Sequence, residues 1–183
     1  MAPGLLTVGH GTLDQNALTS LLHVAHVGLL VDVRRFPGSR HNPAVGRDAL
    51  PQWLPEVGIE YRWEERLGGR RTLSADADED RWWKVEAFRA YAGYTRTAGF
   101  QAALDDLLAE VTGRAAHPDA PAVAVMCSET VWWRCHRRLI ADVTALGRGT
   151  PVHHLMSGGK LTEHPPAAGA RRRPDGLLVW DGS

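Results

Sequence analysis

Five short apolar runs recur along the chain, each bounded by glycine, proline or polar residues. They lie at residues 5–9, 29–33, 59–63, 122–126 and 151–155. Runs of this length and spacing are typical of strands. The run at 29–33 is almost continuously apolar, which favours a strand covered on both faces, as in a parallel sheet. The pattern therefore predicts five strands.

Stretches with helical periodicity separate these runs. Leu18, Leu21, Leu22 and Ala25 would form one apolar stripe of a helix that ends near Gly28. Residues 12–15, just before this stripe, have the spacing of a helix capping box. Further helices are predicted from about residue 49 to Gly58, over 82–91, from Thr97 to about 111, and over 130–146. Strands that alternate with helices predict an α/β fold with an open, mainly parallel sheet and helices on both faces.

The length of 183 residues and a hydrophobic content of 44% suit one well-buried core. We expect a single domain over residues 1–183, with its core at about 5–155. A basic C-terminal extension, 156–183, would carry a final strand at 177–180. The acidic run at 74–80 is predicted to be an exposed, mobile loop whose charge is simply solvated.

The net charge and the hydropathy of the chain exclude some classes of function. Lys plus Arg and Asp plus Glu both total 21, so the net charge is zero. Attraction of the whole molecule to nucleic acid or to an anionic membrane is therefore excluded, and any such contact needs a local patch. No apolar run is long enough to span a bilayer, and the opening Met-Ala-Pro-Gly lacks the features of a secretory signal. We expect a cytoplasmic protein without a membrane partner and without a cofactor.

Polar residues gather just after the predicted strands. In open parallel sheets, ligands bind beyond the carboxyl ends of the strands. The residues that this rule selects are His10, Asp32, Arg34, Glu64, Cys127, Glu129, His153 and His154. Their clustering predicts a site at that edge of the sheet.

The first chemical motif is the turn from Gly9 to Thr12. Its glycines would let the backbone approach a ligand, and the helix that follows would offer unpaired N–H groups to an anion. Thr12 would bind substrate and His10 would orient a reacting group. The alternative is structural: Thr12 only caps the helix, and His10 only packs in the turn.

The second motif runs from Asp32 to Pro43 and is rich in arginine. Guanidinium groups bind phosphate or carboxylate through paired hydrogen bonds, and several of them so close together need acidic partners or a bound anion. Arg34, Ser39, Arg40 and Asn42 are the predicted substrate-binding residues here. Asp32 is a candidate acid, base or charge stabiliser; alternatively, it merely pairs with Arg34 and fixes the loop.

A third, shorter motif is Leu67-Gly-Gly-Arg70-Arg71. It adds cationic groups on a glycine-rich backbone, and Arg70 is predicted to contact substrate. The alternative is a solvated, charged loop.

The fourth motif combines Cys127-Ser-Glu129 with Cys135-His136-Arg137. Glu129 is the leading candidate for an acid or base, and His136 and Arg137 would orient it or hold an anion. Cys127 could act as a nucleophile if neighbouring cations lowered its pKa. The interval from Cys127 to Arg134 is one residue too long for the phosphate loop of cysteine phosphatases and lacks glycine, so that assignment is rejected. Cys135 is expected to pack in the interior, and both thiols are expected to be free rather than joined in a disulfide.

Two further chemistries stay open. The pairs Trp82-Trp83 and Trp132-Trp133 could stack on bases, although adjacent aromatic residues on a helix diverge and one of each pair is expected in the core. A metal site is the other alternative, but its candidate ligands have no diagnostic local spacing. Those ligands are His10, Asp32, Cys127, His136 and His153.

Taken in order, these motifs resemble the domain of unknown function 488 family over about residues 5–155. The resemblance is carried by Thr7-Val-Gly-His-Gly-Thr12, Val31-Asp-Val-Arg34, Pro37, Ser39-Arg40, Asn42-Pro43, Gly58-Ile-Glu-Tyr61, Leu67-Gly-Gly-Arg70, Cys127-Ser-Glu129 and Cys135-His136-Arg137. The family usually has a proline between the last two segments, where this chain has Val131-Trp-Trp133. The resemblance implies an α/β domain and supports these site residues without implying a reaction.

Three functions follow as hypotheses. The leading one is an enzyme that acts on a phosphate-bearing substrate, such as a nucleotide, DNA or RNA, with glycosidic hydrolysis of the DNA-repair type as one version. The second is a non-catalytic module that binds the nucleic-acid backbone through the same arginines. The third is a thiol- or metal-dependent enzyme centred on Cys127.

Overall fold

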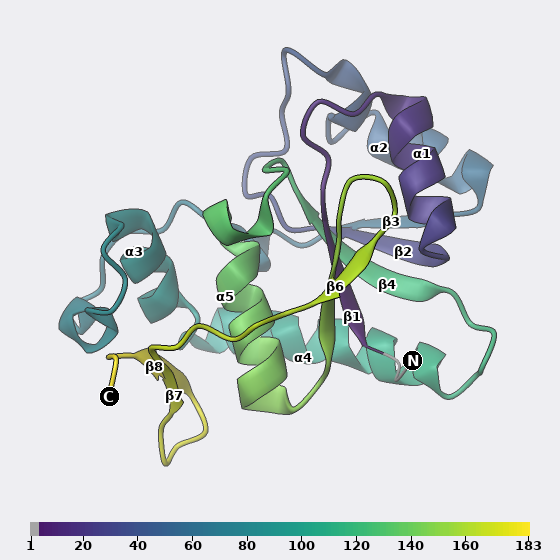
Figure 1. Cartoon of the computed structure of the whole chain (residues 1–183). Coiled ribbons are helices and arrows are strands. Elements are labelled where there is room, and N and C mark those ends of the chain that lie inside the picture. The colour runs from purple at the N-terminus through teal and green to yellow at the C-terminus, as the bar shows by residue number, and fades with distance from the viewer. Residues whose placement is uncertain (1–3) are drawn as a thin grey trace.

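Six strands form the central sheet, in the order β3-β2-β4-β1-β5-β6 (Figure 1). Their bounds are β1 (Leu5–Gly9), β2 (Val27–Asp32), β3 (Glu60–Trp63), β4 (Ala122–Cys127), β5 (Val152–Leu155) and β6 (Leu161–Glu163). Strands β1 to β5 are parallel, and β6 is antiparallel to β5. The predicted, mainly parallel sheet is thus confirmed with all five of its strands, and β6 was not foreseen.

The computed structural model describes residues 4–183. The first three residues, on which the expected lack of a secretory signal partly rests, lie outside the described residues. Among residues 4–183, no helix combines the length and apolar character that a membrane crossing requires.

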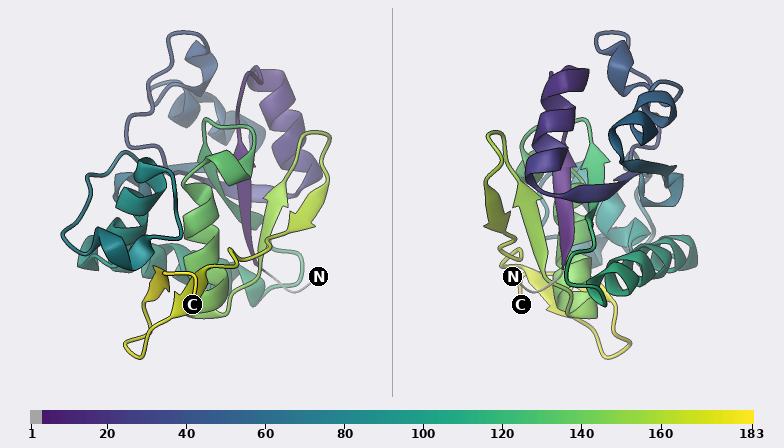
Figure 2. Two further views of the ribbon diagram at one scale, coloured as in Figure 1. Left: turned by 60° about the vertical axis from the view of Figure 1, so that its left-hand side comes forward. Right: turned by 90° about the vertical axis from the view of Figure 1, so that its right-hand side faces the viewer.

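Helices cover both faces of the sheet, as predicted (Figure 2). Their bounds are α1 (Gln15–Val24), α2 (Leu50–Trp53), α3 (Glu86–Tyr94), α4 (Ala98–Ala115) and α5 (Arg137–Asp142). Side chains alternate across a strand, so Leu30 packs in the core with α1 and α2, and Leu29 packs in the opposite core with α3, α4 and α5. Both cores are fully buried, which fixes the register of the strands and therefore the positions of their ends.

The predicted helix boundaries need three corrections. Thr12 does not cap α1; the Asp14 carboxylate does, by accepting a 2.8 Å hydrogen bond from the Ala17 N–H. Helix α3 begins at Glu86 rather than at residue 82, and the Trp82 N–H bonds to the Trp180 carbonyl. The stretch predicted as helix over 130–146 is helical only from Arg137, after an irregular loop with one 3₁₀ turn.

The C-terminal extension is part of the folded core. Strands β7 (Ala170–Arg172) and β8 (Leu178–Trp180) form a separate antiparallel hairpin against the helical layer. Trp180 is fully buried, and its indole N–H donates a 2.8 Å hydrogen bond to the carboxylate of Asp142. The predicted final strand therefore exists, and it closes one end of the core.

Contrary to the prediction, the acidic run at 74–80 is not simply an exposed loop with solvated charges. Asp80 is fully buried and pairs with Arg96 at 2.8 Å. It also accepts the N–H of Trp180 at 3.2 Å. Asp76 reaches the same guanidinium at 3.0 Å. These carboxylates hold the segment against β8, because a buried carboxylate needs ionic or hydrogen-bonded partners.

Candidate functional site

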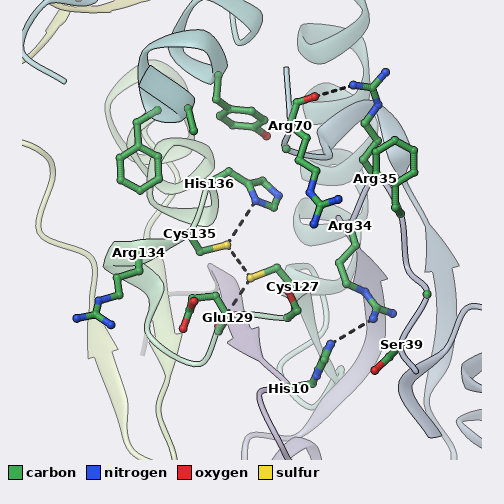
Figure 3. A pocket seen from close by; sticks show the side chains of 17 residues that line it. His10, Arg34, Arg35, Ser39, Arg70, Cys127, Glu129, Arg134, Cys135 and His136 are labelled. Atoms are coloured by element: carbon green, nitrogen blue, oxygen red, sulfur yellow. Dashed lines mark hydrogen bonds between the residues drawn. The ribbon is translucent and has the colours of Figure 1, made fainter. Parts of the chain in front are cut away.

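A cavity of about 340 Å³ lies beyond the carboxyl ends of β1, β2 and β4 (Figure 3). Loops that follow these strands form most of it, and α3 closes one side. Seven predicted site residues line it: His10, Arg34, Ser39, Arg70, Cys127, Glu129 and His136. The fold thus brings side chains from four separate motifs to one place. Of the residues that the strand-end rule selected, His10, Arg34, Cys127 and Glu129 line the cavity, whereas Asp32, Glu64, His153 and His154 do not.

Arg34 and His10 line this cavity next to each other. The Nε and terminal nitrogen of Arg34 donate to the two carboxylate oxygens of Asp32 at 2.8 and 2.6 Å. Asp32 is fully buried and also accepts a hydrogen bond from the Tyr61 hydroxyl. Burial and the neighbouring charge of Asp32 raise the pKa of Tyr61, so the phenol stays protonated. Asp32 does not line the cavity, and these contacts give it the supporting role that the sequence left open as an alternative.

Hydrogen bonds fix the protonation of His10. Nδ1 lies 2.9 Å from the carbonyl of Gly11, which can only accept, so Nδ1 carries the proton. Nε2 is then free to accept a hydrogen bond from Arg34 at 3.2 Å. Burial is the largest effect on the pKa of His10 and lowers it, so the ring is neutral at pH 7. His10 therefore presents a neutral ring at the edge of the cavity.

The glycine turn before α1 allows two segments of the backbone to pack closely against each other. A Cβ at Gly9 would lie 1.9 Å from the carbonyl oxygen of Glu129, so only glycine fits. Gly11 has a φ of 48° and donates its N–H to the Ser128 carbonyl. The predicted backbone approach is real, and its partner is the segment that carries Glu129.

Glu129 has an exposed side chain at the cavity wall (Figure 3). Its carboxylate forms no ion pair with any residue in the described part of the chain. Arg137 is fully buried and does not reach that carboxylate; it donates to the backbone carbonyl of Glu129 instead. Glu129 is thus held in place through its backbone, and its carboxylate stays available.

Cationic side chains without acidic partners surround the cavity. Within residues 4–183, no carboxylate pairs with Arg35, Arg70 or Arg134, all of which line it. Arg70 points toward the centre, between His136 and Arg34, whereas Arg134 extends outward (Figure 3). Arg35 donates to the carbonyl of Arg70 at 2.7 Å and so braces a residue whose φ is 57°. The local positive charge is therefore not neutralised by the protein.

An exposed aromatic ring lies close to two of these guanidinium groups. Phe36 is 62% exposed, and the guanidinium carbons of Arg35 and Arg70 lie 5.4 and 5.9 Å from its ring centroid. Sequence reasoning missed Phe36 and looked to the paired tryptophans instead. Trp83 is in the core, as expected for one of its pair, and Trp132 stacks on His154 at 4.1 Å. None of the four tryptophans lines the cavity.

The sulfur atoms of Cys127 and Cys135 lie 2.6 Å apart beside the cavity. The two cysteines are free, as predicted. Cys135 was expected only to pack in the interior, but its sulfur also contacts Cys127 and His136. Its sulfur is 3.4 Å from Nδ1 of His136, whose Nε2 lies 2.9 Å from the Val33 carbonyl. No sequence pattern indicated this contact, because the seven residues between the two cysteines can place their thiols in many ways.

Four predicted residues besides Asp32 do not line the cavity. Arg137 lies buried behind Glu129, and Thr12 is exposed in the turn before α1. Arg40 is exposed on the loop after Ser39. Asn42 ties that loop down, because its amide donates to the Leu13 carbonyl at 2.6 Å. Among residues 4–183, no group of three His, Cys, Asp or Glu side chains has a metal-binding arrangement.

A buried hydrogen-bonded chain runs away from this cavity. Thr7 contacts Nδ1 of His154 at 2.7 Å, and Nε2 of that ring contacts His164 at 2.9 Å. His164 in turn lies 2.8 Å from Asp142. Arg137 reaches Thr7 at 3.4 Å and so joins this chain to the carbonyl of Glu129. His154 and His164 thus support the fold rather than the pocket.

His154 should make the stability of the protein depend on pH. Burial, followed by the charges of His164 and Arg137, lowers its pKa from 6.5 to about 3. A group whose folded pKa is depressed contributes stability above its unfolded pKa, and this is lost as pH falls. The free energy of unfolding should therefore drop by up to about 3 kcal/mol from this group between pH 7 and 4. Urea midpoints should show a shallower drop in His154→Gln; an unchanged slope would contradict this origin.

Comparison with known protein families identifies the family of this chain. A family model described as "Domain of unknown function DUF488" matches residues 15–144, which is most of the chain. No curated protein and no solved structure matches it. The matched region includes Arg34, Arg70, Glu129 and His136, which lie together in the cavity. The chain therefore belongs to the family known as the domain of unknown function DUF488.

Proposed function

We propose that this protein is an enzyme that acts on a phosphate-bearing substrate, a nucleotide or a nucleic acid, with Glu129 as acid or base. The observation that carries the proposal is that, within residues 4–183, the Glu129 carboxylate has no ionic partner in a cavity where Arg35, Arg70 and Arg134 also lack acidic partners. In a structural ion-pair network these opposite charges would pair with one another, as Asp32 and Arg34 do. Unpaired charges of both signs in one cavity favour a ligand that uses both.

The cations would bind the anionic part of the substrate. Arg70 points toward the centre of the cavity and offers a planar set of donors that matches phosphate oxygens (Figure 3). Phe36 would supply a stacking surface for a base next to the phosphate. The combination of guanidinium and exposed aromatic ring is what favours a nucleotide or nucleic acid over inorganic phosphate.

Glu129 would perform the proton transfer. As a base it would activate a water molecule, and as an acid it would protonate a leaving group. Hydrolysis of a glycosidic bond in a damaged nucleotide is one concrete reaction of this kind, because it needs a carboxylate, phosphate contacts and a stacking ring. His10 and His136 would position groups around the carboxylate.

Substrate binding is the first test. A 5′-phosphorylated single-stranded oligonucleotide should bind about 10- to 100-fold more weakly to Arg70→Gln than to the unchanged protein, since a charged hydrogen bond contributes about 1.5–3 kcal/mol. The slope of log K against log salt should also shrink by about 0.7. Fluorescence anisotropy at several salt concentrations measures both quantities.

Arg172→Gln is the matched control, because Arg172 is an exposed arginine on β7, away from the cavity. Equal losses in the two variants would mean that the oligonucleotide binds by general charge, and the proposed site would be wrong. Weaker binding in Arg70→Gln without any turnover by the unchanged protein would favour the non-catalytic binding module.

A further inference from the structure

The loop between β4 and α5 brings two cysteines into direct contact. Cys127 ends β4 and Cys135 precedes α5, so the loop between them folds back on itself (Figure 3). Their sulfur atoms are 2.6 Å apart, and a disulfide bond is about 2.05 Å long. Bond formation therefore needs a small movement of two side chains.

A neighbouring histidine can accept the proton of one of these thiols. The Val33 carbonyl only accepts hydrogen bonds, so the Nε2 of His136 that contacts it at 2.9 Å must carry a proton. In the neutral ring this leaves Nδ1 without a proton, 3.4 Å from the sulfur of Cys135. Transfer of the thiol proton to Nδ1 gives a thiolate beside an imidazolium, which is the reactive state of a cysteine.

A buried guanidinium supplies a second reason for a thiolate. Arg137 is 1% exposed, and no carboxylate pairs with it within the described residues. Its nitrogens reach the Glu129 carbonyl and Thr7, and its Nε has no partner. A buried cation usually has a counter-charge, and a thiolate next to it would supply one.

The two thiols differ in acidity. Burial raises the pKa of Cys135, but the hydrogen bond from Cys127 and the charges of His136 and Arg137 outweigh it, so its pKa lies well below the usual value. Burial, the contact with Cys135 and the charge of that sulfur raise the pKa of Cys127 well above its usual value. The pair thus consists of one nucleophile and one protonated thiol.

We propose that Cys127 and Cys135 are a redox-active pair that hydrogen peroxide oxidises to a disulfide at the wall of the cavity. The Cys135 thiolate attacks one peroxide oxygen; the O–O bond breaks, Cys135 becomes a sulfenic acid, and the leaving hydroxide takes the proton that Nδ1 of His136 had accepted, which gives water. The Cys127 thiol then attacks the sulfenic sulfur, the S–O bond breaks, and a second water leaves. A small dithiol returns the pair to the reduced state by thiol–disulfide exchange.

Burial selects the class of oxidant. Cys127 is 2% exposed and Cys135 is 6% exposed, yet both line the cavity. A peroxide molecule can enter a cavity of about 340 Å³. Another folded protein is too large to enter it, so its disulfide cannot come close to these buried sulfurs. This inference does not depend on the phosphate-bearing substrate, because it concerns only the thiols and the cations beside them.

Mass spectrometry of the reduced full-length chain after treatment with hydrogen peroxide tests the proposal. After acid quenching and alkylation under denaturing conditions, the oxidised chain should have lost two hydrogen atoms and should carry no alkyl group. Digestion should give one peptide pair linked through Cys127 and Cys135, and dithiothreitol should restore two alkylatable thiols. Two thiols that stay alkylatable, or a sulfinic acid without a disulfide, would overturn the proposal.

Variants assign the roles of the two sulfurs. Cys127→Ser should leave a sulfenic acid on Cys135 that dimedone captures. Cys135→Ser should give neither a disulfide nor a dimedone adduct. His136→Gln should slow disulfide formation at pH 7 by at least about tenfold, because the variant lacks the group that accepts the thiol proton. Equal oxidation rates in His136→Gln and the unchanged chain would exclude the histidine as the proton acceptor.

Discussion

Glu129→Gln should lower the turnover number on a phosphate-bearing substrate by about 10²- to 10⁴-fold, the usual contribution of a positioned acid or base. The substrate is to be found first with the unchanged protein, by screening nucleotides and phosphorylated oligonucleotides for product by mass spectrometry. Binding should change little, or become tighter, because glutamine removes a negative charge next to an anion. A loss confined to turnover is what distinguishes chemistry from binding.

Glu163→Gln is the control for this variant. Glu163 is an exposed carboxylate on β6 without an ion pair in the described part of the chain, so its loss should leave turnover unchanged. If Glu129→Gln retains full turnover, Glu129 is neither the acid nor the base. If both variants lose turnover equally, the effect comes from the general charge of the protein rather than from the cavity.

Asp142→Ala should reduce the free energy of unfolding by about 3–5 kcal/mol. The Asp142 carboxylate is fully buried and accepts three hydrogen bonds: from His164 at 2.8 Å, from the Ala167 N–H at 2.9 Å and from the Trp180 indole at 2.8 Å. Alanine leaves these donors buried without an acceptor, and each unsatisfied donor is costly. The carboxylate also ties the C-terminal hairpin to α5.

Urea denaturation followed by circular dichroism measures this effect. Asp119→Ala, at an exposed aspartate in the loop before β4, should change the free energy of unfolding by less than about 0.5 kcal/mol. A loss of under about 1 kcal/mol for Asp142→Ala would mean that the hairpin and the buried histidine chain contribute little to the stability of the domain.

The local pattern of apolar residues predicted the strands and helices whose buried residues are continuous or regularly spaced in the sequence. Strands β1, β2 and β4 follow from runs that are apolar on both faces, and α4 follows from apolar positions at helical spacing after its cap, Thr97. The position of the site follows from a rule of topology, since parallel strands end at one edge of the sheet. This rule selected His10, Arg34, Cys127 and Glu129, which do line the cavity.

Features that depend on distant parts of the chain could not be predicted. Asp80 looks like a surface charge in the sequence and becomes buried because Arg96 and the backbone of Trp180 meet it. Phe36 looks like an ordinary loop residue, and only the fold places Arg35 and Arg70 close to its ring. The contact of Cys127 with Cys135 has the same origin, because the path of the loop decides it.

The position of a bound phosphate group tests the central claim most directly. A crystal structure of the protein with thymidine 5′-monophosphate should place the phosphate within hydrogen-bond distance of the Arg70 guanidinium, inside the cavity and facing Glu129. The base should stack on Phe36. A nucleotide bound on another face of the molecule, with the cavity left empty, would contradict the account.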